Sequence, residues 1–251
     1  GKSKVTGELI SFDVVGLYPN IPLKPTIEYA EKLPRSVNVH EWIIEDFMKL
    51  LKVCLKTNIC MFRGDLFRFP EDVGIPTGSP SSLLVGELFM DHLEQKILDV
   101  ELLSSRGQCV IWYRYVDDVL CLWEDSHEAL EELLAYLNNR YPTTKFTVKM
   151  GGHEINYLDL HIRLNPSGFT YGVYRKPTLQ MNTSMSSVCH PRQKESSFVW
   201  MIHRLVTLLL WEDAFDNELI MIKTLARQNR MSLDIVVFPV QENFLRDWRK
   251  F

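Results

Sequence analysis

The alternation of apolar and polar positions predicts strands mixed with helices first, followed by a helical region, in this 251-residue chain. A short apolar run from Leu9 to Val15 predicts a buried strand. Two β-favouring runs, 109–116 and 119–123, flank a pair of aspartates, and two such runs joined by a tight acidic turn predict a hairpin. Three further runs predict strands: 145–150, 155–164 and 169–174.

Helical periodicity marks other segments. His40 to Leu55 carries an apolar stripe, and Pro80 to Val100 predicts a helix entered from a loop rich in Gly, Pro and Ser. Asp125 and Glu128 resemble a capping box that opens a helix. Two more helices are predicted over 194–210 and 213–230, after a polar linker at 180–191. The pattern predicts an α+β domain followed by a helical one, with a boundary near 178–191.

Composition and charge narrow the function classes. Apolar residues make up 46% of the chain, but no run of eighteen appears, so we expect no membrane span. The net charge of −4 is unevenly spread: 87–139 holds twelve acids and three bases, and 140–194 holds eight bases and two acids. This distribution suits a metal site beside a phosphate-binding surface, although two ordinary solvated faces would give the same counts.

The cysteines and the first residues of the chain give predictions about disulfides, metal binding and the start of the protein. Five cysteines without a C-x-x-C motif disfavour a disulfide framework and fit a reducing compartment. Cys189 and His190 could ligate a metal, but no second pair lies nearby, so an ordinary loop is favoured. The start shows no signal peptide and enters a strand almost at once, so we expect the chain to be cut from a longer one.

Three carboxylates stand at positions where charge is costly unless it is paired or bound to a metal. Asp13 ends the first predicted strand, and Asp117 and Asp118 occupy the predicted hairpin turn. Nucleotidyl transfer needs carboxylates that hold two divalent ions roughly 3.5–4 Å apart. A lone Asp-Asp pair is common at turns, but the same pair between strands, as in Tyr115-Val116-Asp117-Asp118, is a stronger indication of such a site.

The chain resembles reverse transcriptases over residues 12–178. Phe12 to Pro22 resembles their first motif, and its Leu-Tyr-Pro-Asn-Ile-Pro ending is most similar to Penelope-like retroelements. Four further motifs follow in the family order: Gly74 to Ser82, Arg114 to Asp118, Lys145 to Thr147 with Tyr157 to Asp159, and Val173 to Thr178. The helical remainder, with Glu218 and Lys223, resembles the thumb that follows in this family.

The resemblance implies a role for residues in each motif. Asp13, Asp117 and Asp118, with the backbone carbonyl of Val14, would bind the metal ions. Tyr18 would be the steric gate that excludes a 2′-hydroxyl, with core packing as its plain alternative.

The second motif would supply the nucleotide pocket. Gly78 would let the backbone approach the nucleotide, and Pro76 and Thr77 would line that pocket. A turn glycine is the alternative for Gly78.

The later motifs supply basic residues. Lys145 is the candidate for protonating pyrophosphate, although Lys149 is close and a surface lysine is ordinary. Tyr174, Arg175 and Lys176 would hold the primer backbone, or the two bases could simply be solvated. Asp159 is expected to be structural.

The implied fold is a polymerase palm, an antiparallel sheet with packed helices, over residues 1–180, followed by a small helical thumb over 181–251. The implied cofactor is a pair of Mg²⁺ ions, with Mn²⁺ as a substitute. The implied partners are an RNA template, a DNA primer and deoxynucleoside triphosphates, and the implied location is nuclear.

The sequence departs from the family at a few points. Gly16 stands where the family usually has serine, and Thr77 where it usually has methionine. We expect the fingers that precede the first motif, and an appended endonuclease, to be missing.

Three other functions compete with a reverse transcriptase. A truncated or domesticated fragment could bind nucleic acid without catalysis. An RNA-templated RNA polymerase shares the acids, and Tyr18 argues against it. A metal-dependent nuclease explains the acids but not Gly78-Ser79-Pro80 or the segment from Tyr174.

Overall fold

The computed structural model describes residues 6–36, 39–56, 58–99, 109–177, 188–208 and 210–232. It contains two compact units, one spanning Gly7–Gly152 and the other comprising Gly1–Thr6 and His153–Phe251. Each is described by itself.

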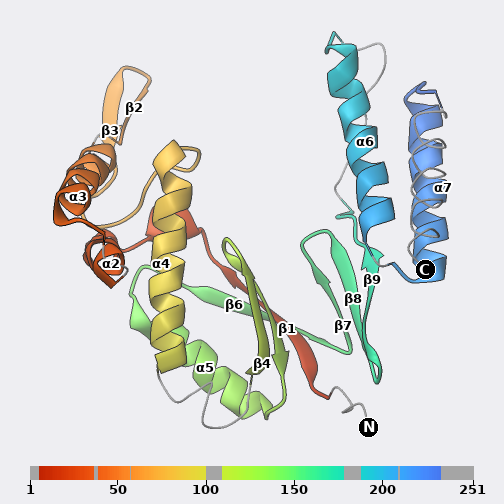
Figure 1. Ribbon diagram of the computed structural model, residues 1–251, viewed down its shortest axis with the longest axis horizontal. Coiled ribbons are helices and arrows are strands. Elements are labelled where there is room, and N and C mark those ends of the chain that lie inside the picture. The colour runs from red at the N-terminus through yellow and green to blue at the C-terminus, as the bar shows by residue number, and fades with distance from the viewer. Residues whose placement is uncertain are drawn as a thin grey trace. The chain divides into compact units, whose positions relative to one another are not determined.

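The first unit is built on a four-stranded antiparallel sheet, seen in Figure 1. Its strand order is β4-β5-β1-β6, which places the first strand of the chain between strands that come more than 100 residues later. The elements of this unit are β1 (Glu8–Val14), α1 (Leu17–Asn20), α2 (Leu23–Ser36), α3 (Glu41–Lys56), β2 (Ile59–Phe62), β3 (Asp65–Arg68), α4 (Pro80–Asp99), β4 (Cys109–Tyr115), β5 (Asp118–Trp123), α5 (His127–Arg140) and β6 (Phe146–Gly152).

The two faces of this sheet differ because successive side chains of a strand point to opposite sides. On β1, Ile10, Phe12 and Val14 are buried, whereas Ser11 is half-buried and Asp13 is exposed. The buried face packs on α4 and α5 and forms one continuous core with them. The other face, which we call the open face, carries Asp13.

Helix α5 begins one residue later than the capping box predicted. The N-cap is Ser126, whose Oγ accepts the backbone N–H of Ala129 at 3.2 Å. Asp125 instead accepts the backbone N–H of Ser126. The prediction of Asp125 as the cap was therefore wrong, because the shorter serine side chain occupies the capping position.

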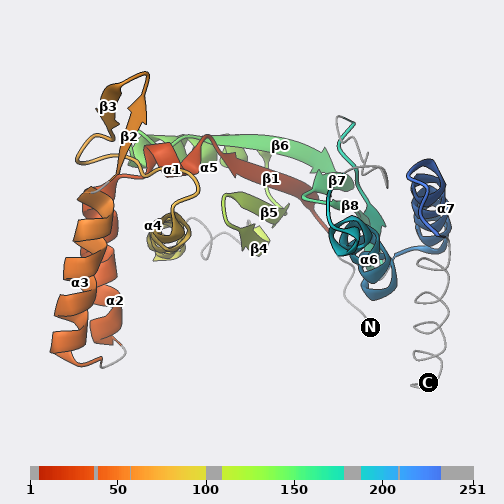
Figure 2. The ribbon, with the colours of Figure 1, turned by 90° about the horizontal axis from the view of Figure 1, so that it is seen from above.

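Three segments between the first two motifs were not predicted from periodicity. Helix α2 carries Pro25 in its first turn and Pro34 near its end, and prolines usually argue against a helix. The β2–β3 hairpin is exposed on both faces, so its sequence lacks the alternation of a half-buried strand. Figure 2 shows α2 and α3 side by side, with this hairpin at one end of them.

The second unit contains a three-stranded sheet and a helix pair. Its elements are β7 (Glu154–Tyr157), β8 (Leu160–Asn165), β9 (Gly168–Val173), α6 (Pro191–Thr207) and α7 (Glu212–Gln228). The single strand predicted over 155–164 is two strands, because Leu158 adopts a left-handed conformation (φ 51°) and turns the chain. Helices α6 and α7 lie side by side (Figure 1) and share a core built on Phe198, Leu205 and Ile222.

The two compact units meet in sequence at residues 152 and 153. This division assigns β7 to β9 to the same unit as α6 and α7. The predicted boundary near 178–191 falls largely in 178–187, which lies outside the described residues. The division into a palm over 1–180 and a thumb over 181–251 stays a prediction about function.

Candidate active site

Two of the three predicted acids face each other across adjacent strands. Asp13 near the end of β1 is the register partner of Asp118 at the start of β5. Directly opposed residues of an antiparallel pair project from the same face, with Cβ atoms about 5 Å apart. The carboxylates of Asp13 and Asp118 therefore share the open face, although they are 105 residues apart in the chain.

The third acid lies in the turn between β4 and β5. Asp117 follows Val116, whose φ of 57° is unusual for a β-branched residue. Tyr18 lies within electrostatic reach of this turn. Burial raises the pKa of the Tyr18 hydroxyl, and the negative charges of Asp117 and Glu87 raise it further. The predicted gate and the predicted metal ligand are thus neighbours.

The chain after β1 is held in a tight turn that follows the acid. Gly16 adopts a left-handed conformation (φ 55°), and Asn20 closes the turn by donating its side-chain N–H groups to the carbonyls of Val15 and Gly16 at 3.2 and 3.0 Å. The hydroxyls of Thr143 and Thr144 donate to the carbonyl of Asn20 at 2.8 and 3.2 Å. Asn20 was not assigned a role from the sequence, although its place in the motif was the available signal.

The second motif is bonded to the first. The backbone N–H of Ile75 donates to the carbonyl of Tyr18 at 2.8 Å, and that of Gly74 donates to Ile21 at 2.9 Å. A Cβ atom at Gly74, where φ is 84°, would collide with the carbonyl of Pro19. These contacts bring the loop that leads to Pro76 and Thr77 beside the Tyr18 turn.

The backbone conformation at residue 78 favours glycine. Its φ is 91°, which glycine adopts readily and other residues do not. Apart from Gly78 and its two neighbours in the chain, no described residue has an atom within 4 Å of the position that a Cβ would take. Among the described residues, the space beside Gly78 is therefore open. Thr77 is exposed, and Pro76 accepts a hydrogen bond from the Ser82 hydroxyl at 2.6 Å.

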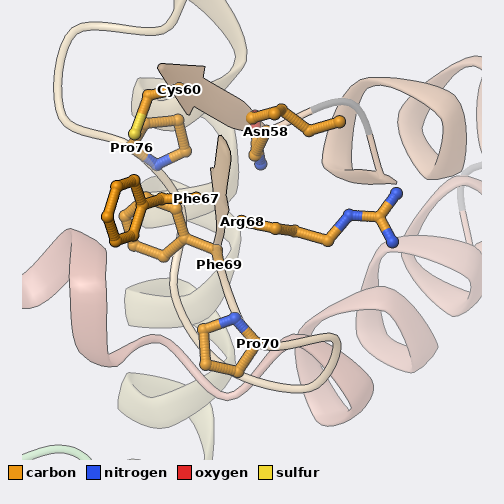
Figure 3. A pocket seen from close by; sticks show the side chains of 8 residues that line it. Asn58, Cys60, Phe67, Arg68, Phe69, Pro70 and Pro76 are labelled. Atoms are coloured by element: carbon orange, nitrogen blue, oxygen red, sulfur yellow. The ribbon is translucent and has the colours of Figure 1, made fainter. Parts of the chain in front are cut away.

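Pro76 also lines a cavity of about 390 Å³ with the β2–β3 hairpin. Figure 3 shows Phe67 and Phe69 on the same side of their strand as Pro76, whereas Arg68 extends to the other side. The cavity therefore lies between the second motif and the β2–β3 hairpin, which periodicity did not predict.

Lys145 lies just before β6, and its ammonium group makes a hydrogen bond within the chain. Its Nζ donates to the backbone carbonyl of Asn138 on α5 at 2.6 Å. The side chain would have to leave this carbonyl to reach a phosphate. Its role as a proton donor stays a prediction.

The open face carries further side chains that the sequence reasoning missed. Tyr115 and Thr147 stand in register with Asp118 and Asp13, so one row crosses all four strands. Tyr113 and Tyr115 are more than 60% exposed, and Lys149 is exposed two residues beyond Thr147. The period of two around the acids was the available signal.

The predicted metal site fits an ion that substrate helps to hold. Among the described residues, no three His, Cys, Asp or Glu side chains form a group that could hold a metal ion by themselves. Magnesium is usually bound by one or two carboxylates together with waters and substrate phosphates. The facing pair Asp13 and Asp118, with Asp117 at the adjacent turn and the carbonyl of Val14 ending the strand, supplies donors of that type.

The predicted primer-binding residues belong to the second unit. The backbone N–H of Tyr174 donates to the carbonyl of Asp159 at 2.8 Å, and Lys176 is exposed. Arg175 is half-buried, and both terminal nitrogens of its guanidinium donate to the carboxylate of Glu218 on α7, one of them at 2.6 Å. Arg204 joins this pair through Glu218 at 3.7 Å, and its Nη1 also donates to the carboxylate of Asp159 at 2.9 Å.

Comparison with known families decides the class. The family model "Reverse transcriptase (RNA-dependent DNA polymerase)" matches residues 3–155, which is more than half of the chain. The chain belongs to the reverse transcriptase family. The match covers the four-stranded sheet and all three acids of this member of the family.

A solved structure supports the fold of this reverse transcriptase. The apo telomerase of Candida tropicalis aligns with 97% of this chain and 47% of its own, with a TM-score of 0.54 and 12% identity. The chain thus spans about half the length of that protein. Both the α+β class and the antiparallel sheet with packed helices are confirmed. The comparison with curated proteins gives no match.

No helix within the described residues has the length and apolar character needed to cross a membrane.

Proposed function

We propose that the chain catalyses DNA synthesis on an RNA template, by transfer of a deoxynucleotide to a primer 3′-hydroxyl. The observation that supports this best is the register of Asp13 and Asp118, which puts two carboxylates on the open face beside the Asp117 turn. An accessible sheet face with adjacent acids suits a reaction on a long, anionic substrate.

Two Mg²⁺ ions at these acids would supply the charge that stabilises the attacking and leaving oxygens. Asp13, Asp117, Asp118 and the carbonyl of Val14 would hold them. Tyr18 would lie under the sugar and exclude a 2′-hydroxyl, and Gly78 would leave room for the nucleotide beside Pro76 and Thr77. Lys145 would give a proton to the departing pyrophosphate.

The remaining assignments follow from the same proposal. Residues 1–180 act as a palm and 181–251 as a thumb, and Tyr174, Arg175 and Lys176 contact the primer. The Leu-Tyr-Pro-Asn-Ile-Pro segment that ends at Pro22 supports a Penelope-like retroelement as the source of the chain, which implies work on nuclear DNA.

Primer extension tests the activity. With an RNA template, a DNA primer, deoxynucleotides and Mg²⁺ or Mn²⁺, we expect the chain to extend the primer. Asp117→Asn should reduce the rate by about 10³-fold, because several kcal/mol of charge stabilisation are lost. A matched control is Asp216→Asn, which removes an exposed carboxylate on α7.

A chain that binds the primer–template but extends it no faster than Asp117→Asn does would favour the inert nucleic-acid-binding fragment. The sugar preference separates the RNA polymerase alternative. Tyr18→Ala should raise the use of ribonucleotides relative to deoxynucleotides by at least roughly tenfold. Equal use of both by the parent chain would contradict the gate.

A further inference from the structure

The turn that carries Asp117 is held in an unfavourable conformation. Val116 has a φ of 57°, and a β-branched side chain makes this region costly. Such a residue persists only where surrounding contacts over-determine it. The contacts that hold Val116 therefore also determine where the next residue, Asp117, places its carboxylate.

Arg114 supplies such a contact. Its Nη1 donates to the carbonyl of Val116 at 3.2 Å, so the side chain folds back onto the turn two residues later. The same Nη1 donates to Glu87 at 2.9 Å, and Nε donates to Glu94 at 2.9 Å. Arg114 thus joins the turn to two carboxylates of one helix, and Figure 1 shows that helix, α4, beside β4.

The hydrogen bonds of Arg114 with Glu87 and Glu94 are largely sheltered from solvent, and Glu94 accepts one further donor. The side chain of Arg114 is 13% exposed and that of Glu94 is 16% exposed. The indole N–H of Trp112 also donates to the same oxygen of Glu94, at 2.9 Å. Hydrogen bonds to charged groups are strong at sheltered sites, so this network fixes the guanidinium firmly.

Arginine suits this position because of its planar fork of donors. A lysine ammonium could keep one or two of the three contacts but could not span both carboxylates and the carbonyl in the same geometry. An ordinary ion pair between a helix and a strand would need only Glu94 or Glu87. The bond to the Val116 carbonyl is the part that such an ion pair does not explain.

We propose that Arg114 is a positioning residue, which acts through the Val116 turn to set the place of the Asp117 carboxylate for a divalent ion. The proposal rests on the proposed function for the identity of the ion site. Glu87 and Glu94 are the anchors that hold the guanidinium to α4.

The binding of Mn²⁺ to the chain with a dideoxy-terminated primer–template and the next deoxynucleotide, followed by the EPR signal of the free ion, tests the proposal without catalysis. We expect Arg114→Met to weaken Mn²⁺ binding by about 10-fold or more, which is the usual effect of removing a group that orients a metal ligand. Arg114→Lys should lie between this variant and the parent. Glu87→Gln keeps the Glu94 pair and should weaken binding less, and its half-exposed site keeps the fold intact if Arg114→Met does not fold.

Trp112→Phe is the matched control, since it removes the other donor to Glu94 and leaves the turn contact in place. It should lower the thermal midpoint without changing Mn²⁺ affinity. Parent-like Mn²⁺ affinity in folded Arg114→Lys and Glu87→Gln, or no Mn²⁺ binding by the parent, overturns the proposal.

Steady-state extension separates this proposal from the proposed function. In an active parent, Arg114→Lys should lower kcat and raise the Mg²⁺ concentration needed for half-maximal rate, with little change in KM for the primer. A parent that binds Mn²⁺ in an Arg114-dependent way but extends no primer would end the polymerase assignment and leave the positioning role intact.

Discussion

Tyr18 lies against a helix that has no side chain at the point of contact. Gly86 is buried in the middle of α4, where glycine costs about 1 kcal/mol relative to alanine. A Cβ atom at Gly86 would lie 3.1 Å from Cε1 of Tyr18 and 3.6 Å from Cδ2 of Leu17. The glycine therefore makes room for the ring of the proposed gate.

Gly86→Ala should shift this ring and change stability little. The added methyl group favours the helix by up to about 1 kcal/mol, and the tight contact offsets this gain. We expect the preference for deoxynucleotides over ribonucleotides to fall several-fold in primer extension, but less than in Tyr18→Ala. In a Tyr18→Ala background the alanine at 86 should have no further effect, and an equal effect in both backgrounds would contradict the contact.

The sequence motifs mark candidate residues for the site, but they do not indicate which residues those candidates contact. The motifs mark the acids, Tyr18 and Gly78 as candidates, and the left-handed backbone at Gly78 is one that glycine adopts readily. The partners of Arg175 and Lys145 could not be found, because Glu218 and the carbonyl of Asn138 reach them through tertiary structure. Periodicity carries no information about which distant side chain meets a given charge.

The β4–β5 hairpin carries two thiols that face each other at its other end. The Sγ atoms of Cys109 and Cys121 are 3.0 Å apart, and both cysteines are free. The hydrogen bond from Cys121 lowers the pKa of Cys109, and the same bond, with burial, raises the pKa of Cys121. The thiolate therefore forms first on Cys109, which is the better nucleophile of the pair.

An oxidant should join these two cysteines. With diamide, each thiol loses a hydrogen and a disulfide forms, because the sulfurs need to approach by only about 1 Å to reach bonding distance. We expect a non-reducing mass lower by two hydrogen atoms, and a faster reaction as the pH rises towards the pKa of Cys109. Cys109→Ser should abolish the product, whereas Cys54→Ser, at an exposed helical site, should not. A disulfide that maps to other cysteines would contradict the geometry.

At the scale of elements, the predictions that succeeded concern elements with one buried face, and the missed elements are the proline-containing helix α2 and the exposed β2–β3 hairpin. Strand β1, helices α3 and α4 and the β4–β5 hairpin have one buried face each, and their bounds fall within two residues of the predicted ones. The β2–β3 hairpin has no buried face, so no pattern marks it. The break between β7 and β8 falls at Leu158, whose left-handed backbone no periodicity marks.

Within the second unit, a buried charge network connects the β7–β9 sheet to the helix pair. Glu218 is 4% exposed and binds Arg175, which follows β9, and Arg204 of α6. The terminal nitrogens of Arg175 that bind Glu218 are the same donors that the proposed primer contact would need, so the two roles exclude each other at any one time. Lys176, the next residue, is exposed to solvent and is therefore accessible to a primer phosphate.

The structural role and the primer contact predict different effects when Arg175 is replaced, the first on stability and the second on nucleic-acid binding. Arg175→Met should lower the free energy of unfolding by about 3–5 kcal/mol, because the carboxylate of Glu218 is left buried without its bidentate partner. Thermal or urea unfolding followed by tryptophan fluorescence measures this change. Glu154→Gln is the control, since it weakens an exposed pair with Arg163 and should leave the free energy of unfolding almost unchanged.

Binding to a primer–template duplex over a range of salt concentrations tests the other role. A phosphate contact contributes about 0.9 to the slope of log K against log salt. We expect Lys176→Met to reduce that slope by about this amount, and Arg175→Met, measured where it remains folded, to leave the slope unchanged. A reduced slope for Arg175→Met with unchanged stability would mean that its guanidinium leaves Glu218 for the primer, and that the ion pair is the resting state of a nucleic-acid contact.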